Sequence, residues 1–336
     1  MFTTAEMDRI FSAANRVELF CRFEASLAQA QAAAGMIPVS AAAAITAACA
    51  EPVPDPERLL KEGWEVGTPV KVLLEHLRRS LPEEHIDHLH HGATTQDAVD
   101  TAAMLQSATA LDSLARSLAE TADVLAAVAD RHRATPSLAR TLLQPAGSTT
   151  HGARFARWLS ATTEARREIR RVRERLPIQL GGPIGDAAAF GDSWPQVTEH
   201  MATALELAVP AAPWHTDRGP VEAAAGIAAR VSGVASKVAS DVALLTAAGE
   251  IRVRAGGSSS IPHKHNPIDA VRAEAAAEVS RVAAAGLISA PAHALERGMG
   301  PWHAEWALLP IAFSAAGAAA EAIGRCISSL QVVDSG

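Results

Sequence analysis

The chain has 336 residues, of which 49% are hydrophobic and 20% are charged, and its formal net charge is -7. It is long enough to bury a large core, since domains commonly contain about 100–200 residues. The negative charge argues against nucleic acid or an anionic membrane surface as the main partner, which leaves small molecules and proteins. Its cysteines, Cys21, Cys49 and Cys326, follow no disulfide or metal-ligand pattern, which is typical of reduced thiols in the cytoplasm.

The N-terminal segment has no basic region followed by an apolar run, so no secretory signal is expected. The most apolar stretch, residues 306–319, is shorter than the roughly 20 residues that a bilayer span needs. The sequence therefore predicts a soluble, cytoplasmic protein without a membrane partner.

Residues 12–50 are rich in alanine and carry apolar side chains at helical spacing. They predict an amphipathic helix and a second helix after Pro38. Three prolines between residues 52 and 56 break this pattern, and a short helix is expected from Pro69 onwards. These segments predict a small N-terminal helical domain over residues 1–92.

Residues 85–101 read HIDHLHHGATTQDAVDT and form the first polar cluster. Four histidines and Asp87 invite a zinc interpretation, but their spacing matches no common structural zinc pattern and no thiolate lies among them. The cluster is more typical of a polar pocket. Because imidazole titrates near neutral pH, His90 is a candidate proton donor.

Two long segments predict helices of a bundle. Residues 100–133 carry large apolar side chains seven residues apart, at Met104, Leu111, Leu118 and Leu125. This spacing is typical of a long helix that packs at shallow angles against others. Residues 221–248 carry a similar apolar stripe. Helices of about 40 Å or more bury little surface alone, so residues 93–332 predict a bundle domain shared within a homotetramer, with residues 333–336 as a tail.

Residues 256–267 read GGSSSIPHKHNP, and their glycines and prolines cannot continue a helix. We expect a mobile loop that holds the hydroxyls of Ser258 and Ser259, the cation of Lys264 and the amide of Asn266. Together these groups could transfer a proton beside an anionic substrate. A Gly/Ser hinge with a solvated lysine is the alternative.

The loop resembles a signature of the fumarase/aspartase superfamily, GSSxMPxKxNP, with Ile261 in the methionine position. Residues 85–101 resemble the signature HxGATSxDxxDT of the same superfamily, and residues 140–152 resemble RTHxQxAxPTTxG. The resemblance implies an all-α fold built on a long-helix bundle. It also implies a further small C-terminal helical domain, which would be largely absent from a chain that ends at residue 336.

The resemblance also implies roles for individual residues. Ser258 would be the catalytic acid or base, with His90 as the other candidate for proton delivery and Lys264 beside the developing charge. Substrate would be bound by a second set of residues: Thr94, Thr95, Gln96, Gln144, Thr149, Arg218, Ser259 and Asn266. No metal or organic cofactor is expected.

The chain departs from the superfamily pattern at two positions. A histidine of the second signature falls at Leu142, and the glutamate with which it pairs falls at Val271. A general acid that assists a basic leaving group typically contributes about 10²–10⁴-fold. A carboxylate leaves without such help, because the pKa of its conjugate acid is about 4. The joint loss therefore favours a reaction in which a carboxylate leaves or attacks.

Intramolecular attack of a carboxylate on a conjugated alkene makes a lactone, which is the reaction of the carboxymuconate cycloisomerase branch of the superfamily. The chain resembles that branch at residues 178–186, 213–218 and 296–306. A small polycarboxylate of aromatic-compound catabolism is then the expected substrate. Two alternatives stay open: a lyase that releases fumarate from an argininosuccinate-, adenylosuccinate- or nitrosuccinate-like substrate, and a catalytically silent helical scaffold.

Three further residues keep open interpretations. Trp302 and Trp306 are four positions apart and fit a helix core as well as a pocket. His151 replaces an apolar residue of the superfamily pattern and receives no role.

Overall fold

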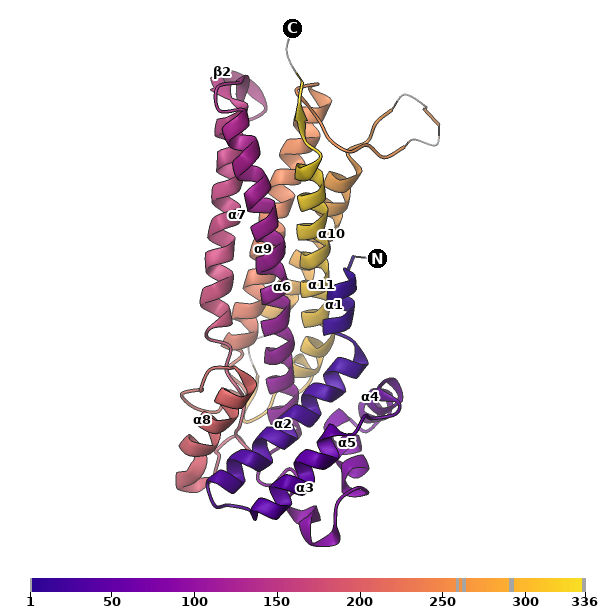
Figure 1. The fold of residues 1–336 in the computed structure, drawn as a ribbon, viewed down its shortest axis with the longest axis vertical. Helices are drawn as coiled ribbons and strands as arrows, with labels where there is room; N and C mark the ends of the chain where they lie inside the picture. The colour runs from indigo at the N-terminus through magenta and orange to yellow at the C-terminus, as the bar shows by residue number, and fades with distance from the viewer. Residues whose placement is uncertain (1, 258–259, 262–263, 290–292, 334–336) are drawn as a thin grey trace.

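A computed structural model describes residues 2–257, 260–261, 264–289 and 293–333. It is an elongated bundle of five long helices, with shorter helices gathered at one end (Figure 1). The expected all-α architecture is confirmed. The long helices are α6 (Thr95–Arg131), α7 (His151–Arg173), α9 (Gly219–Ala247), α10 (Ile268–Ser289) and α11 (Pro301–Ser328).

Helix α6 is the longest, with 37 residues, which corresponds to about 55 Å at 1.5 Å per residue. The four large residues of the predicted seven-residue repeat, Met104, Leu111, Leu118 and Leu125, are all buried. They face α7 and α11, while α10 packs against both α9 and α11. The repeat therefore marks a long helix that packs against other helices, as the sequence predicted.

The shorter helices at the lower end of Figure 1 surround the start of α6. They are α2 (Ala13–Ala33), α3 (Val39–Ala50), α4 (Pro56–Glu65), α5 (Pro69–Arg78), the 3₁₀ helices η1 (Glu83–His88) and η2 (Gly191–Ser193), and α8 (Trp194–Leu205), whereas α1 (Ala5–Ile10) lies midway along the bundle against α6 and α11. Apolar residues of α2 to α5 and of α8 share one core, so a segment from the second half of the chain completes the N-terminal helical group.

Helix α4 was not predicted, because the prolines of residues 52–56 indicated only a break. Asp55 caps this helix by accepting a hydrogen bond from the backbone of Arg58, and Pro56 occupies its first turn. Proline is tolerated there because its missing N–H would have no partner within the helix. The last of the three prolines therefore starts a helix.

A β-hairpin stands at the opposite end of the bundle (Figure 1). Strands β1 (Pro136–Thr141) and β2 (Gln144–Thr150) pair antiparallel around a turn of two residues, Leu142 and Leu143. The shorter strands β3 (Ile251–Arg252) and β4 (Gln331–Val332) pair nearby. The sequence did not indicate the hairpin, because such tight turns usually contain Asn-Gly or a similar pair.

Helix α11 corrects the expectation about the apolar stretch at residues 306–319. The helix has 28 residues and is long and apolar enough to cross a membrane, by length and composition alone. However, 56% of its most apolar window is buried inside the protein, where the helix packs against α6, α9 and α10. This core packing accounts for its composition.

Candidate functional site

The predicted site residues lie at two opposite ends of the bundle. His90, Thr94 and Thr95 lie at the start of α6, whereas Gln144 and Thr149 lie in β2, beyond its other end. The length of α6, about 55 Å, separates the two groups within one chain. We call residues 90–101 and their neighbours the buried-charge end, and residues 136–151 with residues 250–257 and 264–268 the hairpin end. Ser258 and Ser259 lie outside the described residues.

His90 is held at the buried-charge end by Glu24 of α2. The Nδ1 atom of His90 lies 2.7 Å from Glu24 Oε1, and the Glu24 side chain is only 1% exposed. Burial alone would lower the pKa of His90, but the charge of Glu24 and this hydrogen bond raise it above its ordinary value. His90 therefore keeps its proton to higher pH than a free histidine, as a proton donor requires.

Thr94 precedes the first residue of α6 and is approached by a cation. Arg297, in the segment before α11, donates from Nη2 to Thr94 Oγ1 at 3.3 Å and to the carbonyl of Pro183 at 3.0 Å. The N-terminus of a helix carries partial positive charge, and an arginine beside it strengthens binding of an anion. The sequence analysis gave Arg297 no role, although it lies in residues 296–306, which resemble the cycloisomerase branch.

Thr95 is also partnered within the chain. Its Oγ1 atom lies 2.7 Å from the Oγ1 atom of Thr68, which precedes α5. Both hydroxyls are part-buried, so this contact joins the start of α5 to the start of α6. A substrate contact by Thr95 would share its hydroxyl with Thr68.

Asp97 organises the buried-charge end, and the sequence analysis did not single it out. Its carboxylate is fully buried and accepts hydrogen bonds from the backbone N–H groups of Thr94, Gly181 and Gly182 at 2.8–2.9 Å. The Nε2 atom of His215 lies 2.7 Å from it. A side chain at Gly182 would collide with the carbonyl of Gly92, so only glycine allows this close approach. Asp97 thus fixes residues 178–186 against α6.

Arg218, a predicted substrate-binding residue, is paired with two carboxylates within the chain. Its guanidinium donates to both oxygens of Asp100 and to both oxygens of Glu305, at 2.6–3.0 Å, and to the carbonyl of His215 at 3.4 Å. These five hydrogen bonds use all of its N–H donors. Burial alone would lower the pKa of Arg218, but the two carboxylates raise it. Arg218 thus belongs to a buried ion-pair cluster, and its contact with a substrate carboxylate stays a prediction.

Gln96, another predicted substrate-binding residue, belongs to the same buried cluster. It is fully buried, and its Nε2 atom donates to Asp100 Oδ2 at 3.1 Å and to the carbonyl of His215 at 2.9 Å. Trp302 donates from Nε1 to Asp100 Oδ1 at 2.9 Å, so it too is part of this cluster. Gln96 therefore orients Asp100, while its Oε1 atom is buried without a hydrogen-bond partner among the described residues.

At the hairpin end, Glu250 fastens the hairpin to the end of α9. It binds Arg140 at 2.6 Å and Ser137 at 3.1 Å, and Arg154 lies 3.7 Å away. Burial alone would raise the pKa of Glu250, but these donors lower it below its ordinary value. His151, which had no predicted role, is buried with its Nε2 atom 3.9 Å from Glu250. Burial, followed by the charge of Arg154, lowers the pKa of His151.

The predicted catalytic loop starts beside this cluster. Gly256 and Asn266 exchange backbone hydrogen bonds at 2.8 and 3.2 Å, so the loop closes on itself. The side chain of Lys264 is exposed, and Gln144 in β2 is exposed as well. The structure places Lys264, Asn266, Gln144 and Thr149 at one end of the molecule, away from His90 and Thr94. Within the described ranges, no group of three or more His, Cys, Asp or Glu could hold a metal ion.

Comparison with known proteins gives a consistent family. Residues 3–282 match the protein family described as "Lyase". The chain is 38% identical over 334 residues to the 3-carboxy-cis,cis-muconate cycloisomerase of Pseudomonas aeruginosa, covering 96% of this chain and 73% of that protein. It is 35% identical over 326 residues to the nitrosuccinate lyase of Streptomyces davaonensis, covering 92% and 69% respectively.

A solved structure shows the same similarity. The 3-carboxy-cis,cis-muconate lactonizing enzyme of Pseudomonas putida superposes with a TM-score of 0.90 at 35% sequence identity. The superposition covers 99% of this chain and 76% of that one. The chain therefore spans about three quarters of the length of these relatives.

Proposed function

The chain belongs to the lyase family that its residues 3–282 match, within the fumarase/aspartase superfamily, and on that premise we propose that it is a cycloisomerase. Its reaction would interconvert 3-carboxy-cis,cis-muconate and 4-carboxymuconolactone, a step of aromatic-compound catabolism. The observation that carries the proposal is the 38% identity to an enzyme of that name across 96% of the chain. No cofactor is needed, since the reaction moves only a carboxylate oxygen and a proton.

The proposed chemistry is an addition within the substrate that takes up one proton from the enzyme. A carboxylate oxygen of the substrate forms a bond to one carbon of the conjugated alkene, and the electron pair moves toward a neighbouring carboxylate. Lys264 and Asn266 stabilise that developing charge, and preorganised groups of this kind usually contribute most of the rate. Ser258 or His90 then gives a proton to the carbon. The reverse elimination uses the same groups.

The structure supports a reaction that needs no relay between Leu142 and Val271. The Leu142 side chain is 97% exposed at the tip of the hairpin, and Val271 is 54% exposed in the first turn of α10. Neither side chain can transfer a proton. A carboxylate attacking or leaving group is compatible with this pair, because it requires no general acid at its oxygen.

We further propose that each site is shared between subunits of a homotetramer. The two groups of site residues in one chain are too far apart to contact one substrate, so a complete site requires the hairpin end of one chain to meet the buried-charge end of another. Two exposed leucines at the hairpin tip and the exposed Val271, Val282 and Ile288 of α10 supply apolar surface for such contacts.

The activity is tested with 3-carboxy-cis,cis-muconate, by following the loss of its ultraviolet absorbance and the appearance of lactone by proton NMR. We expect Lys264→Ala and Ser258→Ala to lower kcat about 10²–10³-fold, the typical effect of removing one group that stabilises developing charge. Lys237→Ala is the matched control, since Lys237 is an exposed lysine of α9. Wild-type turnover by folded Ser258→Ala would disprove the assigned role of that serine.

The shared site is tested by mixing inactive variants. His90→Asn impairs the buried-charge end and Lys264→Ala impairs the hairpin end. If sites are shared, a mixed assembly contains some sites without either substitution, and part of the activity returns after unfolding and refolding together. If sites lie within one chain, every site keeps one substitution and no activity returns.

A second candidate function is release of fumarate. The 35% identity to a nitrosuccinate lyase favours it, because nitrite is a good leaving group and would also need no relay. Formation of fumarate from nitrosuccinate, without turnover of 3-carboxy-cis,cis-muconate, would select this alternative. A folded oligomer inactive on both compounds would favour the scaffold interpretation.

The cytoplasmic location is also a proposal. Its support is the free state of all three cysteines, Cys21, Cys49 and Cys326, which is typical of a reducing compartment. Fractionation of cells that produce the native chain would test it.

A further inference from the structure

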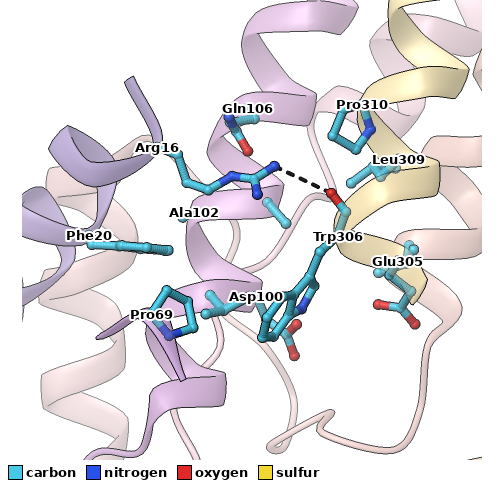
Figure 2. Close-up of a pocket in the computed structure, with 13 residues that line it drawn as sticks. Arg16, Phe20, Pro69, Asp100, Ala102, Gln106, Glu305, Trp306, Leu309 and Pro310 are labelled. Atoms are coloured by element: carbon cyan, nitrogen blue, oxygen red, sulfur yellow. Dashed lines mark hydrogen bonds between the residues drawn. The ribbon is translucent and has the colours of Figure 1, made fainter. Parts of the chain in front are cut away.

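A narrow pocket opens between α2, α5, α6, α9 and α11, and none of the predicted site residues lines it. Figure 2 shows Arg16 of α2 extending across this pocket toward the backbone of Trp306 on α11. Phe20 and Pro69 lie on the same side as Arg16, opposite α11. The centre of a water-sized sphere can move within about 40 Å³ of it. One water molecule needs about 10–15 Å³ on this measure, so the pocket has room for a small ligand.

Arg16 brings a positive charge to the wall of the pocket. Its one hydrogen bond to the part of the chain that the structure describes is from Nη2 to the carbonyl of Trp306, at 3.4 Å. No carboxylate of those residues lies within 4.0 Å of its guanidinium. Burial lowers the pKa of Arg16 below its ordinary value. Arginine stays charged in proteins, so this guanidinium has donors to offer and lacks an anion.

Trp306 contributes a second donor. Its Nε1 atom is buried and has no hydrogen-bond partner within residues 2–257, 260–261, 264–289 and 293–333. The ring itself is well packed, against Trp302 at 4.9 Å and Trp64 at 5.7 Å between centroids. A buried donor without a partner costs about 1–3 kcal/mol. The guanidinium of Arg16 therefore lacks an anion, and the indole N–H of Trp306 lacks an acceptor, within the described residues.

The other residues that line the pocket determine which uncharged part of a ligand fits there. Most of the remaining lining is apolar, with Phe20, Val99, Ala102, Leu309 and Pro310. These side chains favour a hydrocarbon body, and the small volume keeps that body short.

The charges around the pocket limit the ligand to one negative group. Asp100 and Glu305 also line the pocket, and with Arg218 between them they carry a net charge of -1. Arg16 is the cation of this set without a carboxylate partner among the described residues, so it can pair with one carboxylate of a ligand. A second carboxylate on the ligand would therefore face Asp100 and Glu305 without a cation to neutralise it.

We propose that this pocket binds a short-chain aliphatic monocarboxylate. Its carboxylate accepts hydrogen bonds from Arg16 and from the indole N–H of Trp306, and its hydrocarbon chain packs against Phe20 and Leu309. None of the residues with a predicted substrate role lines this pocket, and the proposal stands whether or not the proposed function is correct.

Propionate is the probe, titrated against the full-length chain by saturation-transfer NMR. A ligand of so few atoms has limited interaction energy, so we expect a Kd on the order of millimolar. Arg16→Gln should weaken binding at least about tenfold, consistent with loss of a charge-assisted hydrogen bond. Trp306→Phe keeps the ring and loses the N–H, and we expect a smaller loss of about threefold, within the range of one neutral hydrogen bond. Arg9→Gln removes an exposed arginine of α1 and should change nothing.

Two related compounds test the chemistry. Propionamide has the shape of propionate without its charge, and malonate adds a second carboxylate; both should bind at least several-fold more weakly. Equal binding of malonate or of formate would overturn the assigned ligand class.

Location is tested separately, because propionate could enter the proposed substrate site. Arg297→Gln alters that site and should leave the Kd for propionate unchanged. Loss of binding in Arg297→Gln but not in Arg16→Gln would overturn the proposal, as would no binding by folded wild type. If Arg16→Gln fails to fold by circular dichroism, Trp306→Phe decides the outcome.

Discussion

The two ends of the bundle differ in how completely their polar groups are paired. At the buried-charge end, Asp97, Asp100 and Arg218 are fully enclosed, and their charged groups have partners in the same chain. At the hairpin end, Leu142 and Leu143 form an exposed turn, and the side chain of Lys264 is exposed. The buried-charge end is thus held rigidly by contacts within one chain before substrate binds. The other end has the exposed surface expected of a part that is completed by a neighbour.

The largest effect should come from breaking the buried-charge end. Arg218→Met leaves Asp100 and Glu305 as two buried carboxylates without their cation, and removing one partner of a buried pair typically costs about 3–5 kcal/mol. We expect a loss of this size in the free energy of unfolding, measured with denaturant. Arg171→Met is the control, since Arg171 is 70% exposed and lies 3.9 Å from Glu164. A loss below about 1 kcal/mol would show that the cluster is not rigidly buried.

The pair of His90 and Glu24 should give the next largest effect. Glu24→Gln removes a hydrogen bond between charged groups, which is worth about 1.5–3 kcal/mol. Because Glu24 raises the pKa of His90, the stability from this pair is fully present below the unfolded histidine value and is lost as pH rises through the folded value. The stability difference between wild type and variant should therefore shrink as pH rises.

The same substitution tests proton delivery. If His90 is the donor, Glu24→Gln should move the alkaline limit of turnover to lower pH, measured as kcat/KM against pH. Glu18→Gln is the matched control on the exposed face of α2. An unchanged pH profile in Glu24→Gln would assign proton delivery to Ser258.

Sequence patterns predicted the long helices better than they predicted the partners of individual polar side chains. The seven-residue repeat of α6 identified a long helix correctly, because side-chain periodicity is a local property of the chain. The partners of Arg218 are 118 and 87 positions away, at Asp100 and Glu305, so no local pattern could show that its donors were already occupied. Its predicted substrate-binding role rested on its charge and on the resemblance of residues 213–218 to the cycloisomerase branch, and that role stays a prediction.

The hairpin was missed for a different physical reason. Leu142 and Leu143 have φ values of +49° and +63°, in the left-handed region that side chains disfavour and that turn signals reserve for Gly and Asn. Arg297 was missed because its contact with Thr94 joins residues 203 positions apart. Both Asp97 and Arg297 lie in segments that resemble superfamily signatures, so those segments were the available signal.

The turn offers a third, intermediate effect. The double substitution Leu142→Asn and Leu143→Gly should relieve the left-handed conformation, which costs a side-chain-bearing residue roughly 1–2 kcal/mol. We expect slower amide exchange in β1 and β2. Turnover should nevertheless fall, because the substitution removes the apolar tip that we propose contacts a neighbouring chain. Unchanged turnover would show that the tip lies free in the assembly.

The smallest effect should come from Glu250. The pH dependence of its contribution to stability is opposite to that of His90 at the other end of the bundle. Arg140 and Ser137 lower the pKa of Glu250, so its contribution is present above the unfolded carboxyl value and is lost as pH falls through the folded one. Glu250→Gln should cost less than about 1 kcal/mol at neutral pH, as partly exposed ion pairs do. Hydrogen exchange of the hairpin amides measures this, with the exposed Glu321→Gln as control. In wild type, amide exchange in the hairpin should become faster as pH falls, whereas exchange around His90 should become faster as pH rises. Exchange that becomes faster at both ends with the same change of pH would contradict this difference between the ends.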